Sequence, residues 1–317
     1  INLVRVYMDA VLHPLIYQKP EIFGQEGWHY QFSSEGEPSY KGVVFNEMKG
    51  AFVSPDTLME NEINRRLFPD TCYRFVSGGD PAHIPELSAQ QLAQTHSRLY
   101  HPSNAYIFLD GAIAPEKVLK LLDEEYLAED SAVPAPAPIP FQQPVNAGVS
   151  EIFYELSTQE ELEGRVRLAD GFVACTYQDR EVLTALQALA DTLCGDNHAS
   201  LTKRLLDNKL AKNVSLSVRD GILQPFVTLE VQDIREEQME EVASALKDEL
   251  EKLIREGLDH QRILAALDNM EFQARQRDYG RMPQGLIFGM QIMESWLYGG
   301  DPGANLSVGS LYNNLRN

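Results

Sequence analysis

The chain has 317 residues, of which 44% are hydrophobic and 23% are charged, a composition typical of proteins that fold around an apolar core. Its 47 acidic and 27 basic side chains give a formal charge of −20, which repels phosphate backbones and anionic membrane surfaces. Composition therefore argues against a nucleic-acid or membrane partner. The acidic balance suits a cationic or zwitterionic partner such as a peptide, although a solvated acidic surface is the commoner reason for it.

The first 128 residues are predicted to be mainly helical. INLVRVYMDAVLHPLI, at the start, has apolar residues at helical spacing and no residue that could cap the helix, so we expect it to be cut from a longer helix. An extended stretch is expected around residues 28–32, and a further helix from Pro55 with Asp56 in its first turn.

Residues 41–52, KGVVFNEMKGAF, predict a short helix with a carboxylate on its apolar side. Six residues form a broad apolar arc: Val43, Ala51, Val44, Met48, Phe52 and Phe45. Glu47 falls inside this arc. An ionised carboxylate on a buried face is costly unless it meets a cation, a metal ion or strong donors. The residues alone leave open an ion pair with Lys49, Arg65 or Arg66, or ligation of a metal held also by residues elsewhere.

Three further elements are expected before residue 128. The stretch 84–100 predicts a helix capped by Ser88 or Glu86. The nearly continuous apolar run 105–113, AYIFLDGAI, predicts a strand. Residues 115–127 predict a helix that begins at Pro115 and carries Val118, Leu121 and Leu122 on one face.

A proline-rich stretch divides the chain. Residues 129–148 contain five prolines and no periodic apolar pattern, so we expect an extended linker between a first domain, 1–128, and a second domain, 149–317. In the second domain the pattern predicts strands at 151–157 and 164–178, a helix at 182–195 closed by Gly195, and an antiparallel pair at 213–220 and 225–233. Two helices follow, one ending at Gly257 and one capped by Asp259. This order indicates an α+β fold.

The sequence lacks most signatures of enzyme classes. Its three cysteines, Cys72, Cys175 and Cys194, are never in a CxxC pair, which fits a reducing compartment. Its seven histidines form no HExxH or HxxEH, and His96 and His101, the closest pair, are expected to be structural. No signal peptide is recognisable, and no apolar run approaches the ~18 residues of a membrane span.

Four ordered blocks nevertheless resemble one family. FGQEGWHYQF, YKGVVFNEMKGAFVSPDTL, LFPDTCYRFVSGGDPAHIPELS and YHPSNAYIFLDG are similar to the presequence-protease branch of the insulinase-like, or pitrilysin-type, zinc metallopeptidases. The later RLLDNKLAKNVS and WLYGGDP follow the family's second domain more loosely. The resemblance implies two α+β metallopeptidase-type domains, the first truncated at its N-terminus and the second incomplete at its C-terminus.

The resemblance also implies a site. In the family, zinc is held by two histidines of an HxxEH helix, whose glutamate is the general base, and by a downstream glutamate in the NEMKG block, which here is Glu47. This chain has no HxxEH, so we expect no catalytic residue within it, the motif to lie upstream of Ile1, and zinc to be bound in the intact parent rather than in this fragment.

The function expected from the resemblance is that of part of a zinc-dependent endopeptidase. Its parent would hydrolyse short unstructured peptides in a clamshell chamber completed by a C-terminal half, in the cytoplasm or an organelle matrix. The alternative is a non-catalytic peptide-binding or assembly subunit of the same fold. Retention of NEMKG argues against the alternative, because a decayed site gains little from keeping a carboxylate on an apolar face.

Overall fold

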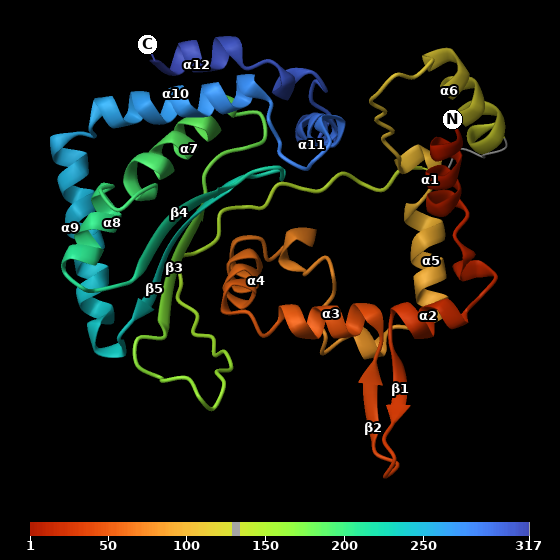
Figure 1. Cartoon of the computed structure of the whole chain (residues 1–317), viewed down its shortest axis with the longest axis horizontal. Coiled ribbons are helices and arrows are strands. Elements are labelled where there is room, and N and C mark those ends of the chain that lie inside the picture. Colours follow the sequence, from red (N-terminus) through yellow and green to blue (C-terminus); the bar gives the residue numbers. More distant parts are fainter. Residues whose placement is uncertain (129–133, 317) are drawn as a thin grey trace. The chain divides into compact units, whose positions relative to one another are not determined.

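The computed structural model describes residues 1–128 and 134–316 (Figure 1). The chain divides into two compact units, one of Ile1–Pro140 with Asn146–Glu155 and one of Phe141–Val145 with Leu156–Asn317. The opening part of the predicted linker, 129–133, lies outside the described residues, and residues 134–148 form neither helix nor strand. The predicted domain boundaries at 128 and 149 stay a prediction.

The first unit is built of helices and one hairpin. Its elements are α1 (Asn2–Leu12), η1 (Leu15–Tyr17), α2 (Glu21–Glu26), β1 (His29–Phe32), β2 (Pro38–Lys41), α3 (Val43–Ala51), α4 (Pro55–Leu67), η2 (Cys72–Arg74), η3 (Ile84–Glu86), α5 (Ala89–Leu99), η4 (Pro102–Asn104), α6 (Pro115–Leu122) and the π-helical turn η5 (Asp123–Leu127). The helix predicted at the start ends at Leu12, because the residue before Pro14 disfavours helical backbone.

Side-chain caps fix where two of these helices begin. The Ser54 hydroxyl accepts a hydrogen bond from the Thr57 amide at the start of α4. Ser88 and Gln91 form a reciprocal capping box on α5, so Ser88 and not Glu86 is the cap.

The faces predicted for the helices at 1–16 and 115–127 pack on each other. Val118, Leu121 and Leu122 of α6 are buried, and Val4 and Met8 of α1 pack against them. At the surface of the same contact, the Arg5 guanidinium pairs with the carboxylate of Glu125. Amphipathic faces therefore join segments that lie over a hundred residues apart in sequence.

The second unit has a three-stranded antiparallel sheet in the order β3-β5-β4. Its strands are β3 (Val166–Val173), β4 (Asn213–Arg219) and β5 (Phe226–Ile234). Cross-strand partners share a face of a sheet. Leu168, Val231 and Val214 are aligned across the three strands and form an apolar row, whereas Glu230 is aligned with Ala169 and Ser215 on the opposite face.

Helices cover the apolar face of this sheet. Buried side chains of α7 (Arg180–Cys194), α8 (Ser200–Asp207) and α9 (Met239–Glu256) form one core with Val214, Val231 and Ile234 of the strands, and Figure 1 shows these helices on one side of the sheet. Ala188 of α7 also packs with α10 (His260–Gln276) and α12 (Gly309–Arg316) through Leu267 and Tyr312. The remaining elements are η6 (Glu236–Gln238), α11 (Gln284–Trp296) and η7 (Ala304–Leu306).

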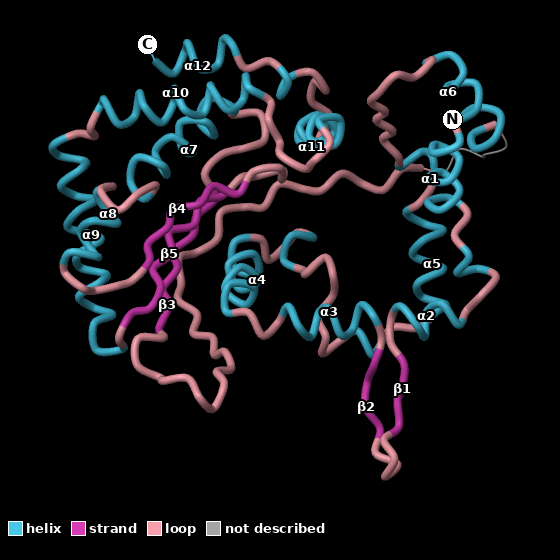
Figure 2. The backbone as a smooth tube through the Cα atoms, viewed as in Figure 1, coloured by secondary structure: helices cyan, strands magenta, loops and turns pink. Residues whose placement is uncertain are grey.

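Two strand predictions are wrong. Residues 105–113 and 151–157 form no strand, and strands are confined to the β1–β2 hairpin and the β3-β5-β4 sheet in the part of the chain described (Figure 2). Side chains of the first stretch remain partly exposed, as Leu109 and Ile113 show at 37% and 41%. A strand needs a neighbour for its backbone hydrogen bonds, and neither stretch has one in the described ranges.

The predicted α+β class is confirmed, with helices packed on an antiparallel sheet in the second unit. Each helix in the described ranges is too short or too polar to cross a bilayer.

Candidate functional site

The position of α3, which carries Glu47, is set by a close backbone approach. Gly42 precedes the helix with a φ of 150°, and a Cβ there would collide with the carbonyl of Gly27. The Phe45 amide donates a 3.3 Å hydrogen bond to the same Gly27 carbonyl. The start of α3 is therefore held against the end of α2.

The side of α3 that is buried differs from the expected arc. Phe45 is 7% exposed and its ring lies 5.8 Å from that of Tyr40, whereas Val43 and Val44 are 52% and 38% exposed. Met48 lies against Gly78, where a Cβ would touch its sulfur. Phe45 and Met48, three residues apart, form the packed stripe, and the stripe with Val43 and Glu47 faces outward. The expectation that Glu47 is buried is wrong.

Of the partners left open for Glu47, the two arginines are engaged elsewhere. Arg65 donates to both oxygens of Glu62, at 2.7 and 2.6 Å, and this bond holds the pKa of Glu62 below its ordinary value. Arg66 donates a 2.9 Å bond to the Ser150 hydroxyl. Within the described part of the chain, the Glu47 carboxylate forms no hydrogen bond or ion pair.

No metal centre is complete among residues 1–128 and 134–316, since no three histidine, cysteine, aspartate or glutamate side chains gather there. The structural role expected of the closest histidine pair is confirmed. His96 donates from Nε2 to the Val11 carbonyl at 2.8 Å and shares a 2.7 Å bond with the Tyr17 hydroxyl, and His101 accepts from the Ser103 amide. Of the expected metal ligands, this chain offers Glu47 alone.

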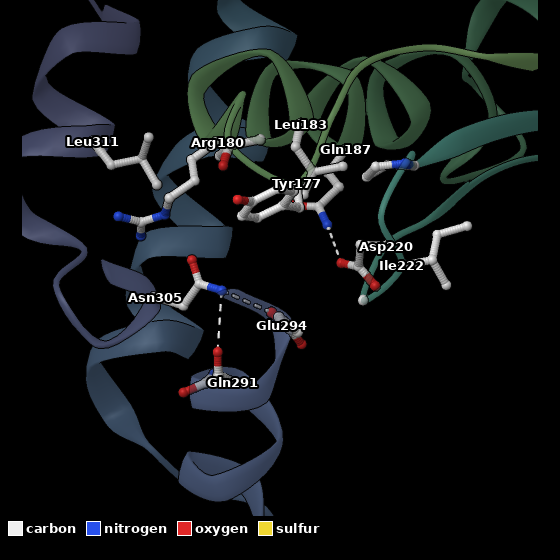
Figure 3. Close-up of a pocket in the computed structure, with 13 residues that line it drawn as sticks. Tyr177, Arg180, Leu183, Gln187, Asp220, Ile222, Gln291, Glu294, Asn305 and Leu311 are labelled. Carbon is white, nitrogen blue, oxygen red and sulfur yellow. Dashed lines mark hydrogen bonds between the residues drawn. The ribbon is translucent and has the colours of Figure 1, made fainter. Parts of the chain in front are cut away.

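The second unit contains a polar pocket of about 150 Å³ that sequence reasoning missed (Figure 3). Arg180, at the start of α7, lines one part of it, Asp220 in the β4–β5 turn lines another, and Glu294 comes from α11. Gln187 donates a 2.9 Å bond to Asp220, and Asn305 donates a 3.3 Å bond to Glu294. The pocket therefore joins four elements through polar groups.

Burial and the neighbouring Asp220 raise the pKa of Glu294 to about 7. Burial also lowers the pKa of the Arg180 guanidinium. A signal for this site was present in the sequence, since Glu294 is the only charged residue of α11, QGLIFGMQIMESW. Like Glu47, Glu294 is a carboxylate on a largely apolar helix.

The fold and sequence place the chain in a peptidase family. The family model described as the peptidase M16 inactive domain matches residues 86–270, more than half of the chain. The chain therefore belongs to the M16 peptidase family, and the resemblance expected from its four sequence blocks is confirmed.

Particular relatives are longer than this chain. Protein HypA of Clostridium perfringens is 39% identical over 307 residues, which are 96% of this chain and 32% of that protein. Presequence protease 1, chloroplastic/mitochondrial, of Arabidopsis thaliana is 34% identical over 95% of this chain and 28% of its own length. The mitochondrial presequence protease of Mus musculus is 30% identical over 99% of this chain and 31% of its own length. The chain thus spans about a third of the length of these relatives.

Solved structures support the same fold. The peptidase M16 inactive domain from Pseudomonas fluorescens superimposes with a TM-score of 0.63 at 18% identity, covering 86% of this chain and 62% of that one. A protease from Helicobacter pylori gives a TM-score of 0.61 at 15% identity, and the match covers 86% of this chain and 64% of that protease chain. Identities this low bear on the fold and not on activity.

Proposed function

We propose that this chain is part of a zinc-dependent endopeptidase that hydrolyses short unstructured peptides, and that Glu47 is one of its zinc ligands. Family membership and the relatives named presequence protease support the reaction class. The observation that carries the proposal is the exposed Glu47 carboxylate, which has no cation partner in the described ranges. A carboxylate already neutralised by an arginine would bind a metal less well.

The chain supplies only part of such a centre. Catalytic zinc sites take three protein ligands and leave one position for water or substrate. Glu47 would be one ligand, and the resemblance implies that two histidines and the general base come from an HxxEH helix outside these 317 residues. When bound, zinc polarises the peptide carbonyl and lowers the pKa of its water. The chain alone is therefore proposed to be inactive and without zinc.

The remaining features of the proposal concern the surroundings of the site. The C-terminal half would complete a chamber around the peptide, and main-chain contacts would dominate recognition. A cytoplasmic or organelle-matrix location is supported by three free cysteines and by relatives named as mitochondrial or chloroplastic.

Substitution of Glu47 in the full-length protein tests the proposal. Glu47→Gln should lower zinc content and peptidase activity at least tenfold while the circular dichroism spectrum stays unchanged, because an amide is a poor zinc ligand. Metal analysis after gel filtration measures the content. Glu35→Gln, on the exposed β1–β2 turn, is the matched control. Full zinc content and activity in Glu47→Gln would remove Glu47 from the site.

One observation favours a second candidate. The matching family model is described as the inactive domain, and its range, 86–270, begins after Glu47. A non-catalytic peptide-binding or assembly subunit is therefore the alternative. A full-length protein that binds peptides but contains no zinc and cleaves none of them would support it.

A further inference from the structure

The pocket of the second unit holds charges of opposite sign that do not neutralise each other directly. Arg180 donates a 3.1 Å bond to the Ser307 carbonyl, and no ion pair joins it to Asp220 or Glu294 in the described ranges. Figure 3 shows the Arg180 guanidinium on the side of the pocket away from Asp220, and Glu294 beside Asn305, its hydrogen-bond donor. Glu294 is electrostatically coupled to both Arg180 and Asp220.

Each carboxylate keeps capacity for a further partner. Gln187 reaches one oxygen of Asp220, and Asn305 reaches one oxygen of Glu294. The other oxygen of each has no hydrogen-bond partner in the described part of the chain. The guanidinium has five N–H donors, of which one is used by Ser307. A ligand could therefore bind both kinds of group without breaking the bonds that shape the pocket.

The dimensions limit such a ligand to a small molecule. The cavity is about 150 Å³ and partly enclosed, and a cavity of roughly 150 Å³ is enough for benzene. Alanine has as many non-hydrogen atoms as benzene. Leu183 and Ile222 supply apolar lining for a short side chain.

We propose that this pocket binds a small zwitterion of the α-amino acid class, with the ligand carboxylate on Arg180 and its ammonium group on Asp220 and Glu294. A simple anion would have the two carboxylates facing it, and a simple cation would face the partly buried guanidinium. A ligand that carries both charges can pair with the guanidinium and with the carboxylates at the same time. The raised pKa of Glu294 agrees with an acid held in an incompletely paired, half-buried environment. The inference does not depend on metal ligation by Glu47, which lies in the other unit.

Titration calorimetry of the 317-residue chain with three ligands tests the proposal. L-alanine should bind saturably, whereas acetate and methylammonium, which each carry one of the two charges, should bind at least tenfold more weakly. Acetate binding as tightly as alanine would reassign the pocket to anions. Methylammonium binding as tightly would reassign it to cations, and absence of alanine binding would overturn the proposal outright.

Variants place the ligand in this pocket. Arg180→Gln and Glu294→Gln should each weaken alanine binding at least tenfold, with Arg255→Gln and Glu240→Gln, on exposed parts of α9, as matched controls that leave it unchanged. Equal affinity in all four proteins would put the binding elsewhere and contradict the proposal. Because the three-ligand comparison uses the unaltered chain, a variant that misfolds does not remove the test.

Discussion

Two glutamates on apolar helices, Glu47 and Glu294, differ in their surroundings. Glu47 is solvated on the outer side of α3, whereas Glu294 is half-buried between α11 and the β4–β5 turn. Burial disfavours the charged form of a carboxylate. It raises the pKa of Glu294 to about 7, far from the ordinary 4.5. The charge of Glu294 therefore changes near neutral pH.

This shift predicts a pH dependence of stability. The folded protein keeps a proton on Glu294 that the unfolded chain releases above about pH 4.5, so the free energy of unfolding falls as pH rises towards about 7. As pH rises through this window, the free energy of unfolding of Glu294→Gln should increase relative to that of the wild type by roughly 2 kcal/mol in total. This value is discounted for the partial exposure of Glu294.

Urea denaturation of both proteins across this pH window measures the difference. Carboxyls with lowered pKa values, such as Asp179 and Asp196, make the same contribution to the stability of both proteins. Their contribution therefore cancels in the difference between the two free energies of unfolding. Glu240→Gln provides an exposed control. Parallel curves for wild type and Glu294→Gln would contradict the raised pKa.

At the scale of single elements, caps determine where helices begin. The Asp259 carboxylate accepts hydrogen bonds from the Gln261 and Arg262 amides, at 2.9 and 3.4 Å, at the start of α10. These amides have no partner within the helix itself. The preceding helix, α9, is followed by Gly257, whose φ of 85° is strained for other residues. The turn between α9 and α10 is thus specified locally.

Asp259→Ala should lower the free energy of unfolding by about 1 kcal/mol, because two amides lose their acceptor. Asp259→Asn should retain most of the stability, since its side-chain oxygen can still accept. Urea midpoints of the three proteins measure the effect. An equal loss of stability in both variants would show that the charge of Asp259 at the helix end, and not its side-chain cap, stabilises the helix.

Local signals of this kind explain how much of the fold the sequence predicted. Ser88, Gly195, Gly257 and Asp259 mark helix ends correctly, and the antiparallel pair expected at 213–220 and 225–233 corresponds to β4 and β5. The run 105–113 was mistaken for a strand because hydrophobicity does not report whether a neighbour is present. The apolar side of α3 was identified, but which stripe of it is buried depends on Gly27 and Gly78, far from it in sequence.

The candidate sites depended on different kinds of information. Glu47 stood out because its charge interrupts an apolar arc, and only family resemblance connected it to zinc. The polar pocket is assembled from Arg180, Asp220 and Glu294 on separate elements, over a hundred residues apart at the extremes. No local pattern could have predicted that these three side chains meet.

At the scale of the whole molecule, charge repulsion opposes folding. With 47 acidic and 27 basic side chains, like-charge pairs outnumber opposite pairs over long distances. Raising NaCl from about 20 mM to about 150 mM reduces the Debye length to about 8 Å and should raise the urea midpoint. A midpoint that falls with salt would show that the ion pairs, such as Arg65 with Glu62, outweigh the net repulsion.

The contact between Gly42 and Gly27 has a consequence for any search for functional residues by mutation. A side chain at position 42 would push α3 away from α2 and carry the Glu47 carboxylate with it. In a screen scored by the zinc binding that we propose for Glu47, Gly42 variants would then be grouped with variants of the ligand itself. Gly42 has no side chain that could bind a metal, so its apparent importance would belong to the helix that it positions.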